Sequence, residues 1–324
     1  LGHGAQRAVQ MALIQCLAQR GLVGIGTTRR LLLVEEPELY MHPQGVEQVR
    51  VALKRLSKQG YQVLISTHSP LAIEPEDVPD TLLIRKTKDR GTEARQTLRA
   101  AAQSAIADYP SQTRMLLSLS NSSRILFADR VVLTEGKTEQ RLIPSLFAKS
   151  QGKTLALARV ALISQGGVDN TGKSMAILSA LDLPCKAVVD LDYAFRGAIR
   201  DDFLDKDDED VATCKDVFKK IALTYACNLD AEGLPAKGGA LTAGEAFAKL
   251  GVHEDAIPRI ESLHTKLLNK NIWVWRLGCM DNHLGLDSKS ESAWAEFLRD
   301  FDTAGFSSLP DEQGVIAFLN WLEV

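Results

Sequence analysis

The stretch VVLTEGKTE (Val131–Glu139) joins an apolar run to an acidic turn and to the start of a helical pattern. Glu135 follows the apolar run directly, and Gly136 permits a tight turn because glycine has no Cβ atom. Glu139 comes four residues after Glu135, one helical turn further on and on the same side. The stretch therefore predicts a strand-to-helix junction that presents two carboxylates.

A second acidic motif, VVDLDYAF (Val188–Phe195), also follows an apolar run. Asp190 and Asp192 are two residues apart at the end of a predicted strand, so both side chains can point the same way. Hard carboxylate oxygens, with no cysteine or histidine among them, favour Mg²⁺ or Mn²⁺ over zinc. Each pair alone is also explained by an exposed helix or loop residue. Together, each after a strand of one sheet, the pairs favour a metal site.

Apolar runs and helical patterns alternate around these motifs. The predicted elements are strand 130–133, helix 138–148, strand 158–163, helix 172–181, strand 187–189 and strand 272–276. This alternation predicts an α/β fold with a Rossmann-like parallel sheet over 127–324. Residues from about 200 to 270 are predicted to form a helical insertion, whose acidic run Asp201–Asp210 we expect to be an exposed loop.

The N-terminal region has its own acidic turn, LLLVEEPE (Leu31–Glu38), at the end of a predicted strand. With a helix over 44–59 and a strand over 63–65, it forms a β-α-β unit in the Walker B layout. Glu35 would hold the metal that bridges nucleotide phosphates, and Glu36 would orient the attacking water. An acidic pair at a helix start is also favoured by the helix dipole.

Two neighbouring motifs strengthen the nucleotide interpretation. In VLISTHSP, His68 lies just past the second strand and could sense a γ-phosphate. In LGHGAQR, Gly2 and Gly4 precede a helix whose N-terminus can face phosphate. A rival signal, GVDNTGKS (Gly167–Ser174), matches the P-loop pattern. We interpret it as a glycine turn of the second sheet, because it follows the Walker B and histidine motifs instead of preceding them.

These motifs resemble the signature, Walker B and switch-histidine motifs of ABC-type ATPases, in the version found in the OLD (overcoming lysogenization defect) family. The glutamate and Asp-x-Asp motifs of the C-terminal region resemble the Toprim domain of OLD nucleases, topoisomerases and bacterial primases. The chain starts without Met and inside the signature motif. We therefore expect it to be part of a longer protein that supplies a Walker A loop, without which this half-domain cannot bind ATP.

The resemblance extends to IWVWRLGCMDNHLGL (Ile272–Leu286), where Asp281 stands in place of the commoner glutamate. It implies two divalent ions, Mg²⁺ or Mn²⁺, about 4 Å apart. Glu135, Glu139 and Asp281 are assigned to one metal region, and Asp190 with Asp192 to the other. Lys289 is the candidate for a phosphate-neutralising lysine, with Lys173 as a rival. His283 is a ligand, a base or, as we favour, a supporting residue.

The resemblance implies a DNA endonuclease or nickase regulated by ATP with Mg²⁺, with a role in phage defence or DNA repair. We expect residues 1–100 to form the ATPase half, 101–126 linker helices and 127–324 the Toprim domain, in a homodimer joined through the ATPase and neighbouring helices. The alternatives are an ATP-switched DNA-binding assembly protein, favoured by the substituted Asp281, and a Toprim topoisomerase or primase.

Bulk properties limit the class of protein. A net charge of −3 and a pI near 6.1 argue against a histone-like protein that coats nucleic acid. Five cysteines without C-x-x-C spacing support neither a disulfide framework nor a zinc knuckle. No apolar run approaches the length of about 18 residues that spans a bilayer, and no signal peptide is evident at the N-terminus. We therefore expect a cytoplasmic protein that acts away from membranes.

Overall fold

The computed structural model describes residues 9–10, 12–14, 16, 30–74, 76–87, 89–105, 124–165 and 170–323. The chain forms two compact units, Leu1–Thr81 with Leu117–Phe127, and Leu82–Leu116 with Ala128–Val324. Among the described helices, none combines the length and apolar character that crossing a membrane requires.

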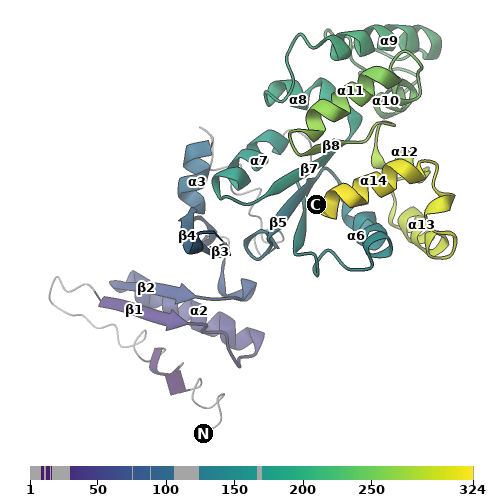
Figure 1. The fold of residues 1–324 in the computed structure, drawn as a ribbon. Helices are drawn as coiled ribbons and strands as arrows, with labels where there is room; N and C mark the ends of the chain where they lie inside the picture. The colour runs from purple at the N-terminus through teal and green to yellow at the C-terminus, as the bar shows by residue number, and fades with distance from the viewer. Residues whose placement is uncertain are drawn as a thin grey trace. The chain divides into compact units, whose positions relative to one another are not determined.

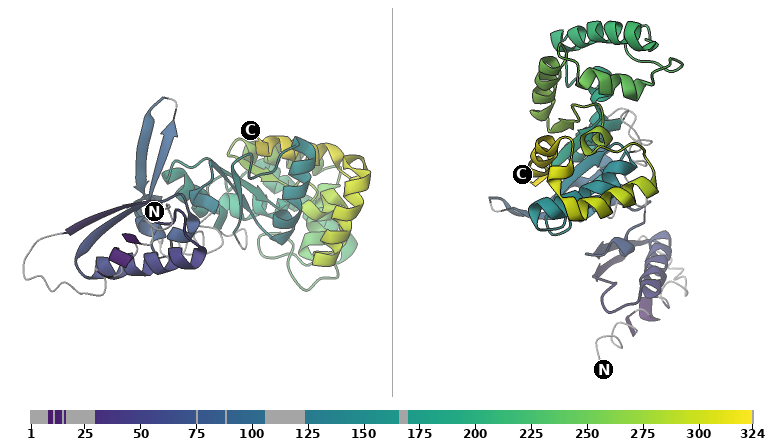
Figure 2. Two further views of the ribbon diagram at one scale, coloured as in Figure 1. Left: turned by 90° about the horizontal axis from the view of Figure 1, so that it is seen from below. Right: turned by 90° about the vertical axis from the view of Figure 1, so that its right-hand side faces the viewer.

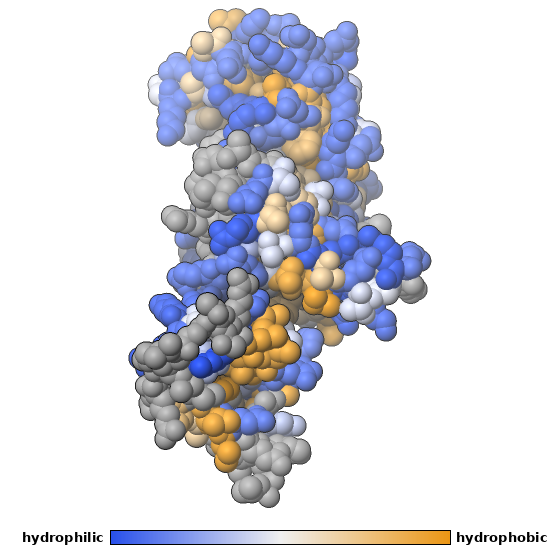
Figure 3. Space-filling model, turned by 90° about the vertical axis from the view of Figure 1, so that its left-hand side faces the viewer, coloured by the Kyte–Doolittle hydropathy of each residue, from blue (hydrophilic) through white to orange (hydrophobic). Residues whose placement is uncertain are grey.

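The N-terminal unit contains a β-α-β arrangement, as predicted. Strands β1 (Arg30–Glu35) and β2 (Tyr61–Ser66) pair in parallel, and α2 (Pro43–Lys58) connects them. The inner face of the strands packs on apolar residues of α2 that include Leu53 and Leu56. On the outer face, Leu31 and Leu33 are 60% and 66% exposed. The surface of this unit carries hydrophobic patches, coloured orange in the lower part of Figure 3.

The C-terminal unit contains a parallel four-stranded sheet in the order β6-β5-β7-β8. Its strands are β5 (Arg130–Thr134), β6 (Val160–Ser164), β7 (Cys185–Val189) and β8 (Ile272–Val274). The chain leaves β5 toward β6 and then returns to β7 on the other side of β5. The strand order therefore reverses between β5 and β7, and such a switch point is where open α/β sheets bind ligands.

Helices cover the sheet and create its core (Figure 1). Strand β5 leads into α6 (Lys137–Gln151), and α7 (Thr171–Ala180) packs against β7. Three C-terminal helices, which sequence analysis did not predict, share an apolar core with α6: α12 (Met280–Leu284), α13 (Glu291–Ala304) and α14 (Glu312–Glu323). The largest side chains of this core are aromatic, and they include Phe147, Trp275 and Phe318.

The predicted helical insertion is present between β7 and β8. It contains α8 (Gly197–Arg200), α9 (Glu209–Tyr225), α10 (Ala243–Gly251) and α11 (Ile257–Leu268). The right-hand view of Figure 2 shows these green helices as a layer at one end of the unit. Three aromatic rings, Phe195, Phe218 and Phe247, pack mutually with centroids 5.0 to 5.8 Å apart and join the insertion to the end of β7.

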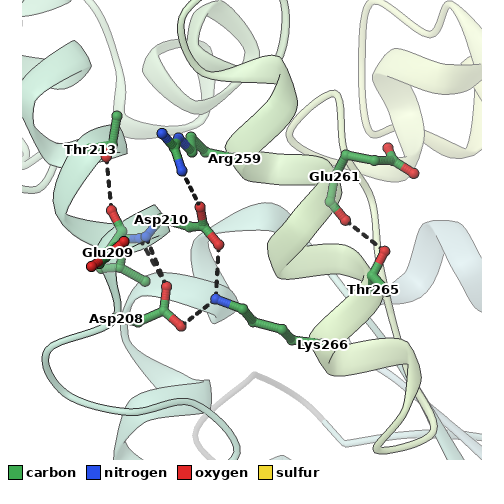
Figure 4. Close-up of polar contacts among 9 residues, drawn as sticks. Asp208, Glu209, Asp210, Thr213, Arg259, Glu261, Thr265 and Lys266 are labelled. Atoms are coloured by element: carbon green, nitrogen blue, oxygen red, sulfur yellow. Dashed lines mark hydrogen bonds and ion pairs between the residues drawn. The ribbon is translucent and has the colours of Figure 1, made fainter.

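The prediction of an exposed loop over Asp201–Asp210 is wrong at its C-terminal end. Asp210 is buried in the first turn of α9, where its carboxylate accepts bonds from Lys266 at 2.8 Å and Arg259 at 3.1 Å (Figure 4). Asp208 caps α9 by accepting from the Asp210 N–H and also pairs with Lys266 at 2.6 Å. Asp208 and Asp210 therefore start a helix and tie it to α11.

A hairpin precedes the sheet. Strands β3 (Leu82–Thr87) and β4 (Gly91–Thr97) pair antiparallel, and α3 (Leu98–Ala105) packs on α7. Arg95 bonds Asp182 at 2.6 Å, which ties the hairpin to the C-terminal unit. The first compact unit ends at Thr81 before resuming at Leu117, and the domain bounds at residues 100 and 126 stay a prediction.

Candidate functional site

Glu135 and Asp190 lie side by side at the switch point of the four-stranded sheet. They directly follow β5 and β7, which pair in parallel with Thr134 opposite Val188. The Glu135 Oε2 atom accepts a bond from the Asp190 N–H at 3.4 Å. The parallel register therefore brings together two acids that are 55 residues apart in sequence.

The carboxylates of this edge disfavour one another's charge. Burial, with the charge of Asp192, raises the pKa of Glu135 to about 7. Burial, with the charges of Glu135 and Glu139, raises the pKa of Asp190 well above its ordinary value. Burial also raises the pKa of Asp192. Like charges held together away from water favour a cation or a proton between them.

Two oxygen atoms of this group are suited to a metal. The Oδ1 atoms of Asp190 and Asp192 are buried and form no hydrogen bond with any described residue. Buried polar atoms normally have a partner, so orphaned carboxylate oxygens point to a missing one. Hard oxygen donors of this kind fit Mg²⁺ or Mn²⁺. Among the described residues, however, no three acid, histidine or cysteine side chains are gathered closely enough to hold an ion.

Asp281 and Lys289 come from the segment after β8. Asp281 is buried in the first turn of α12, and its Oδ1 atom accepts a bond from Thr138 Oγ1 at 3.3 Å. Lys289 Nζ lies 3.3 Å from the other Asp281 oxygen. Burial lowers the pKa of Lys289, but the charges of Asp190 and Asp281 outweigh it and raise that pKa overall. The lysine therefore stays cationic beside the carboxylates.

Glu139 has a structural contact that sequence analysis missed. Its Oε2 atom accepts a bond from the Gly136 N–H at 3.2 Å and closes the start of α6. Burial raises its pKa, and the charge of Asp281 acts in the same direction. Thr138, also missed, lies in the first turn of α6 beside Glu139, and the only sequence signal for it was its place inside EGKTE.

A cavity of about 330 Å³ opens beside these groups. Its lining includes Asp190, Asp192, Asp281 and Lys289, together with residues 243–245, 247 and 248 of α10 in the insertion. The structure therefore brings Asp190, Asp192, Asp281 and Lys289 to one concave surface, whereas Glu135 and Glu139 are not among its lining residues. The rival, Lys173, is exposed on α7 and is not part of this lining.

At the start of α7, one backbone N–H of the P-loop-like pattern is already bonded. Residues 166–169 lie outside the described part of the chain, but Gly172 is described, and its N–H donates to Asp201 Oδ2 at 3.0 Å. A Cβ atom at Gly172 would lie 2.6 Å from Asp201. The glycine is therefore needed for close packing on Asp201, whereas the predicted glycine turn at Gly166 and Gly167 lies outside the described residues.

In the N-terminal unit, the predicted Walker B and histidine motifs meet at the ends of β1 and β2. The Glu36 N–H donates to the Ser66 carbonyl at 2.8 Å, and Glu36 adopts a φ of 43°. Its Oε1 atom lies 3.4 Å from His68 Nε2. Glu35 ends β1 opposite Ser66. Both acids and the histidine thus lie at one edge, while Gly2 and Gly4 lie outside the described residues.

A further acid, which the sequence motifs did not point to, lies at this edge. Glu38 Oε1 accepts bonds from Thr67 Oγ1 at 2.5 Å and from the His68 N–H at 3.2 Å. The carboxylate therefore holds the backbone that carries His68. In the sequence, the sign of this contact was that Glu38 is the second acid of the stretch Glu36-Pro37-Glu38.

Comparisons with known proteins find a family match in the N-terminal region and another in the C-terminal region. Residues 126–192 match the family described as overcoming lysogenization defect protein-like, TOPRIM domain, and residues 1–73 match the AAA ATPase domain family. The Old nuclease of Escherichia phage P2 is 29% identical over 306 residues, which cover 92% of this chain and 50% of that protein. The OLD nuclease of Thermus scotoductus is 27% identical over 194 residues, covering 59% of this chain and 35% of that protein.

The chain spans half of the phage P2 protein and about a third of the Thermus protein. Its N-terminal match carries the edge of Glu35, Glu36 and His68, and its Toprim match runs from the start of β5 to Asp192. The ATPase match precedes the Toprim match along the chain. In both its N-terminal and its C-terminal region, this chain resembles the OLD-family ATPase–Toprim proteins.

Proposed function

We propose that the C-terminal unit cleaves phosphodiester bonds of DNA in a reaction that depends on Mg²⁺ or Mn²⁺. The observation that carries the proposal is the group of buried acids at the β5–β7 switch point, with orphaned oxygens on Asp190 and Asp192. Both curated relatives are named nucleases. An acid cluster with a raised pKa at a concave edge is a typical signature of a catalytic site.

Each side chain has a role in this proposal. Glu135, Glu139 and Asp281 serve one metal region, and Asp190 with Asp192 serve the other. When bound, the ions supply neutralisation of phosphate charge and activation of water. Lys289, fixed beside Asp281 at 3.3 Å, adds a positive charge that faces the scissile phosphate. Thr138 keeps the Asp281 carboxylate in place through its 3.3 Å bond.

For the N-terminal unit we propose a part in ATP binding and hydrolysis with Mg²⁺ in the full-length protein. Glu35 would hold the metal and Glu36 would orient the attacking water. The 3.4 Å contact between Glu36 and His68 supports a role of the histidine beside the γ-phosphate. Control of DNA cleavage by this ATPase, in a homodimer that acts in phage defence or DNA repair, completes the proposal.

Cleavage of supercoiled plasmid tests the nuclease function. The protein, Asp190→Asn and the control Asp216→Asn are compared at matched concentration with Mg²⁺ or Mn²⁺. Asp216 is exposed on α9 and pairs only locally with Lys219, so its variant matches the charge change away from the site. We expect Asp190→Asn to lower the cleavage rate by about 100-fold or more, because a ligand is lost. Equal cleavage by Asp190→Asn and the wild type would refute the assignment.

A DNA-binding assembly protein is the second candidate. It is favoured by Asp281, whose carboxylate is already satisfied by Thr138 and Lys289 without a metal. A folded, metal-saturated protein that binds plasmid DNA but never nicks it would establish this alternative in place of the nuclease.

A further inference from the structure

Both ring nitrogens of His283 are already engaged. The side chain is buried in α12, with 1% of its surface exposed. Its Nε2 atom lies 3.0 Å from the Leu277 N–H, and its Nδ1 atom lies 2.5 Å from Asp311 Oδ2. A backbone N–H can only donate, so Nε2 accepts and Nδ1–H donates to Asp311. The ring therefore has no free nitrogen for a metal or for proton transfer.

The bond to Leu277 continues toward the catalytic acids. Leu277 and Gly278 form the turn after β8, and the Gly278 carbonyl accepts a bond from the Leu191 N–H at 2.7 Å. Leu191 stands between Asp190 and Asp192, the two acids with orphaned oxygens. Two hydrogen bonds, joined by the covalent backbone of Leu277 and Gly278, thus lead from His283 to the backbone of the Asp-Leu-Asp motif.

Asp311, the partner of the other ring nitrogen of His283, is anchored in the core. Asp311 immediately precedes α14, and its Oδ1 atom accepts a bond from the Gly314 N–H at 3.0 Å. A Cβ atom at Gly314 would lie 2.0 Å from Asp311 Oδ2, so only glycine allows this approach. Helix α14 itself is held by buried residues that include Val315 and Phe318. The Asp311 carboxylate is therefore a rigid support for the imidazole.

We propose that His283 and Asp311 are positioning residues that fix the turn Leu277–Gly278, orient Asp190 and Asp192 through Leu191, and thereby set the affinity of the site for a divalent cation. This inference rests on the proposed metal-dependent function. Partners that orient metal ligands from behind typically change metal affinity by about 10- to 100-fold when they are removed.

Two substitutions of His283 separate its two bonds. In His283→Asn the amide nitrogen can replace Nδ1 and keep Asp311, but the acceptor for the Leu277 N–H is lost. In His283→Gln the longer amide oxygen can replace Nε2 and keep Leu277. We expect Mn²⁺ affinity, titrated by electron paramagnetic resonance, to weaken about 10-fold in His283→Asn. We expect His283→Gln to stay within about threefold of the wild type, since the bond toward Leu191 is retained.

Melting temperatures distinguish positioning from general stability. A positioning role predicts that the two variants differ in Mn²⁺ affinity although their melting temperatures are similar. Equal losses in both variants, in proportion to lowered melting temperatures, would overturn the inference. Gly314→Ala tests it without touching the imidazole, because the new methyl group displaces Asp311. We expect weaker Mn²⁺ binding here too, and unchanged affinity in both Gly314→Ala and His283→Asn would also overturn the inference.

Asp190→Ala separates this inference from the proposed function. If Asp190→Ala abolishes Mn²⁺ binding and His283→Asn leaves it unchanged, the function stands and the inference fails. If the wild type and Asp190→Ala bind Mn²⁺ equally poorly, the proposed metal site fails and the inference fails with it.

Discussion

The ion pairs at the start of α9 predict a measurable loss of stability in Asp210→Asn. Asparagine preserves the size of the side chain but removes the charge that faces Lys266 at 2.8 Å and Arg259 at 3.1 Å. The Asp210 side chain is 8% exposed, whereas those of Lys266 and Arg259 are 42% and 47% exposed. The acid is thus buried, but its partners can still reach water after the substitution.

The expected cost lies between two limits. Breaking a fully buried ion pair costs about 3–5 kcal/mol, because the remaining charge stays buried. Breaking an exposed pair costs about 0–1 kcal/mol. Because the acid is buried and its basic partners are half-exposed, we expect Asp210→Asn to lower the free energy of unfolding by about 2 kcal/mol. For a unit of this size, that lowers the melting temperature by roughly 4–8 °C.

Differential scanning calorimetry of the wild type, Asp210→Asn, Lys266→Met and the double variant measures this cost. A coupling energy of at least about 1 kcal/mol between Asp210 and Lys266 is expected, since the pair is in direct contact. Asp216→Asn, on the exposed face of α9, is the matched control and should change stability by less than about 0.5 kcal/mol. If Asp210→Asn costs no more than this control, the burial argument is refuted.

Three further predictions concern other parts of the chain. Burial lowers the pKa of His264, whose Nδ1–H donates to the Val274 carbonyl at 3.0 Å. The unfolded state therefore binds more protons than the folded state below about pH 6.5, and the free energy of unfolding falls as the pH drops through this value. Chemical denaturation should show a weaker fall in His264→Gln. Phe218→Ala removes the centre of the aromatic cluster of the insertion and should cost about 3–5 kcal/mol in thermal unfolding, whereas the exposed control Leu223→Ala should cost little. Glu38→Ala releases the Thr67–His68 backbone, so the amide of His68 should exchange its hydrogen about tenfold faster, and an unchanged rate would show that the carboxylate does not hold the loop.

Local patterns predicted much of the fold because each element depends mainly on nearby residues. Apolar runs next to Glu135 and Asp190 marked β5 and β7, and helical periodicity marked α2 and α6. The C-terminal helices α12 to α14 were not predicted, although the sequence of α13 has apolar residues at helical spacing. The buried end of the acidic run was missed because its partner Lys266 lies 56 residues away.

The sequence by itself determined the α/β class, the order of ATPase and Toprim motifs, and the identity of the candidate acids, because residue types at a strand end are a local property. Only the tertiary structure decided which residues act together. The reversal of strand order places Asp190 against Glu135, and packing of α12 and α14 gives His283 its partners Leu277 and Asp311. Burial and hydrogen bonding depend on residues far apart in sequence, so no local pattern carries them.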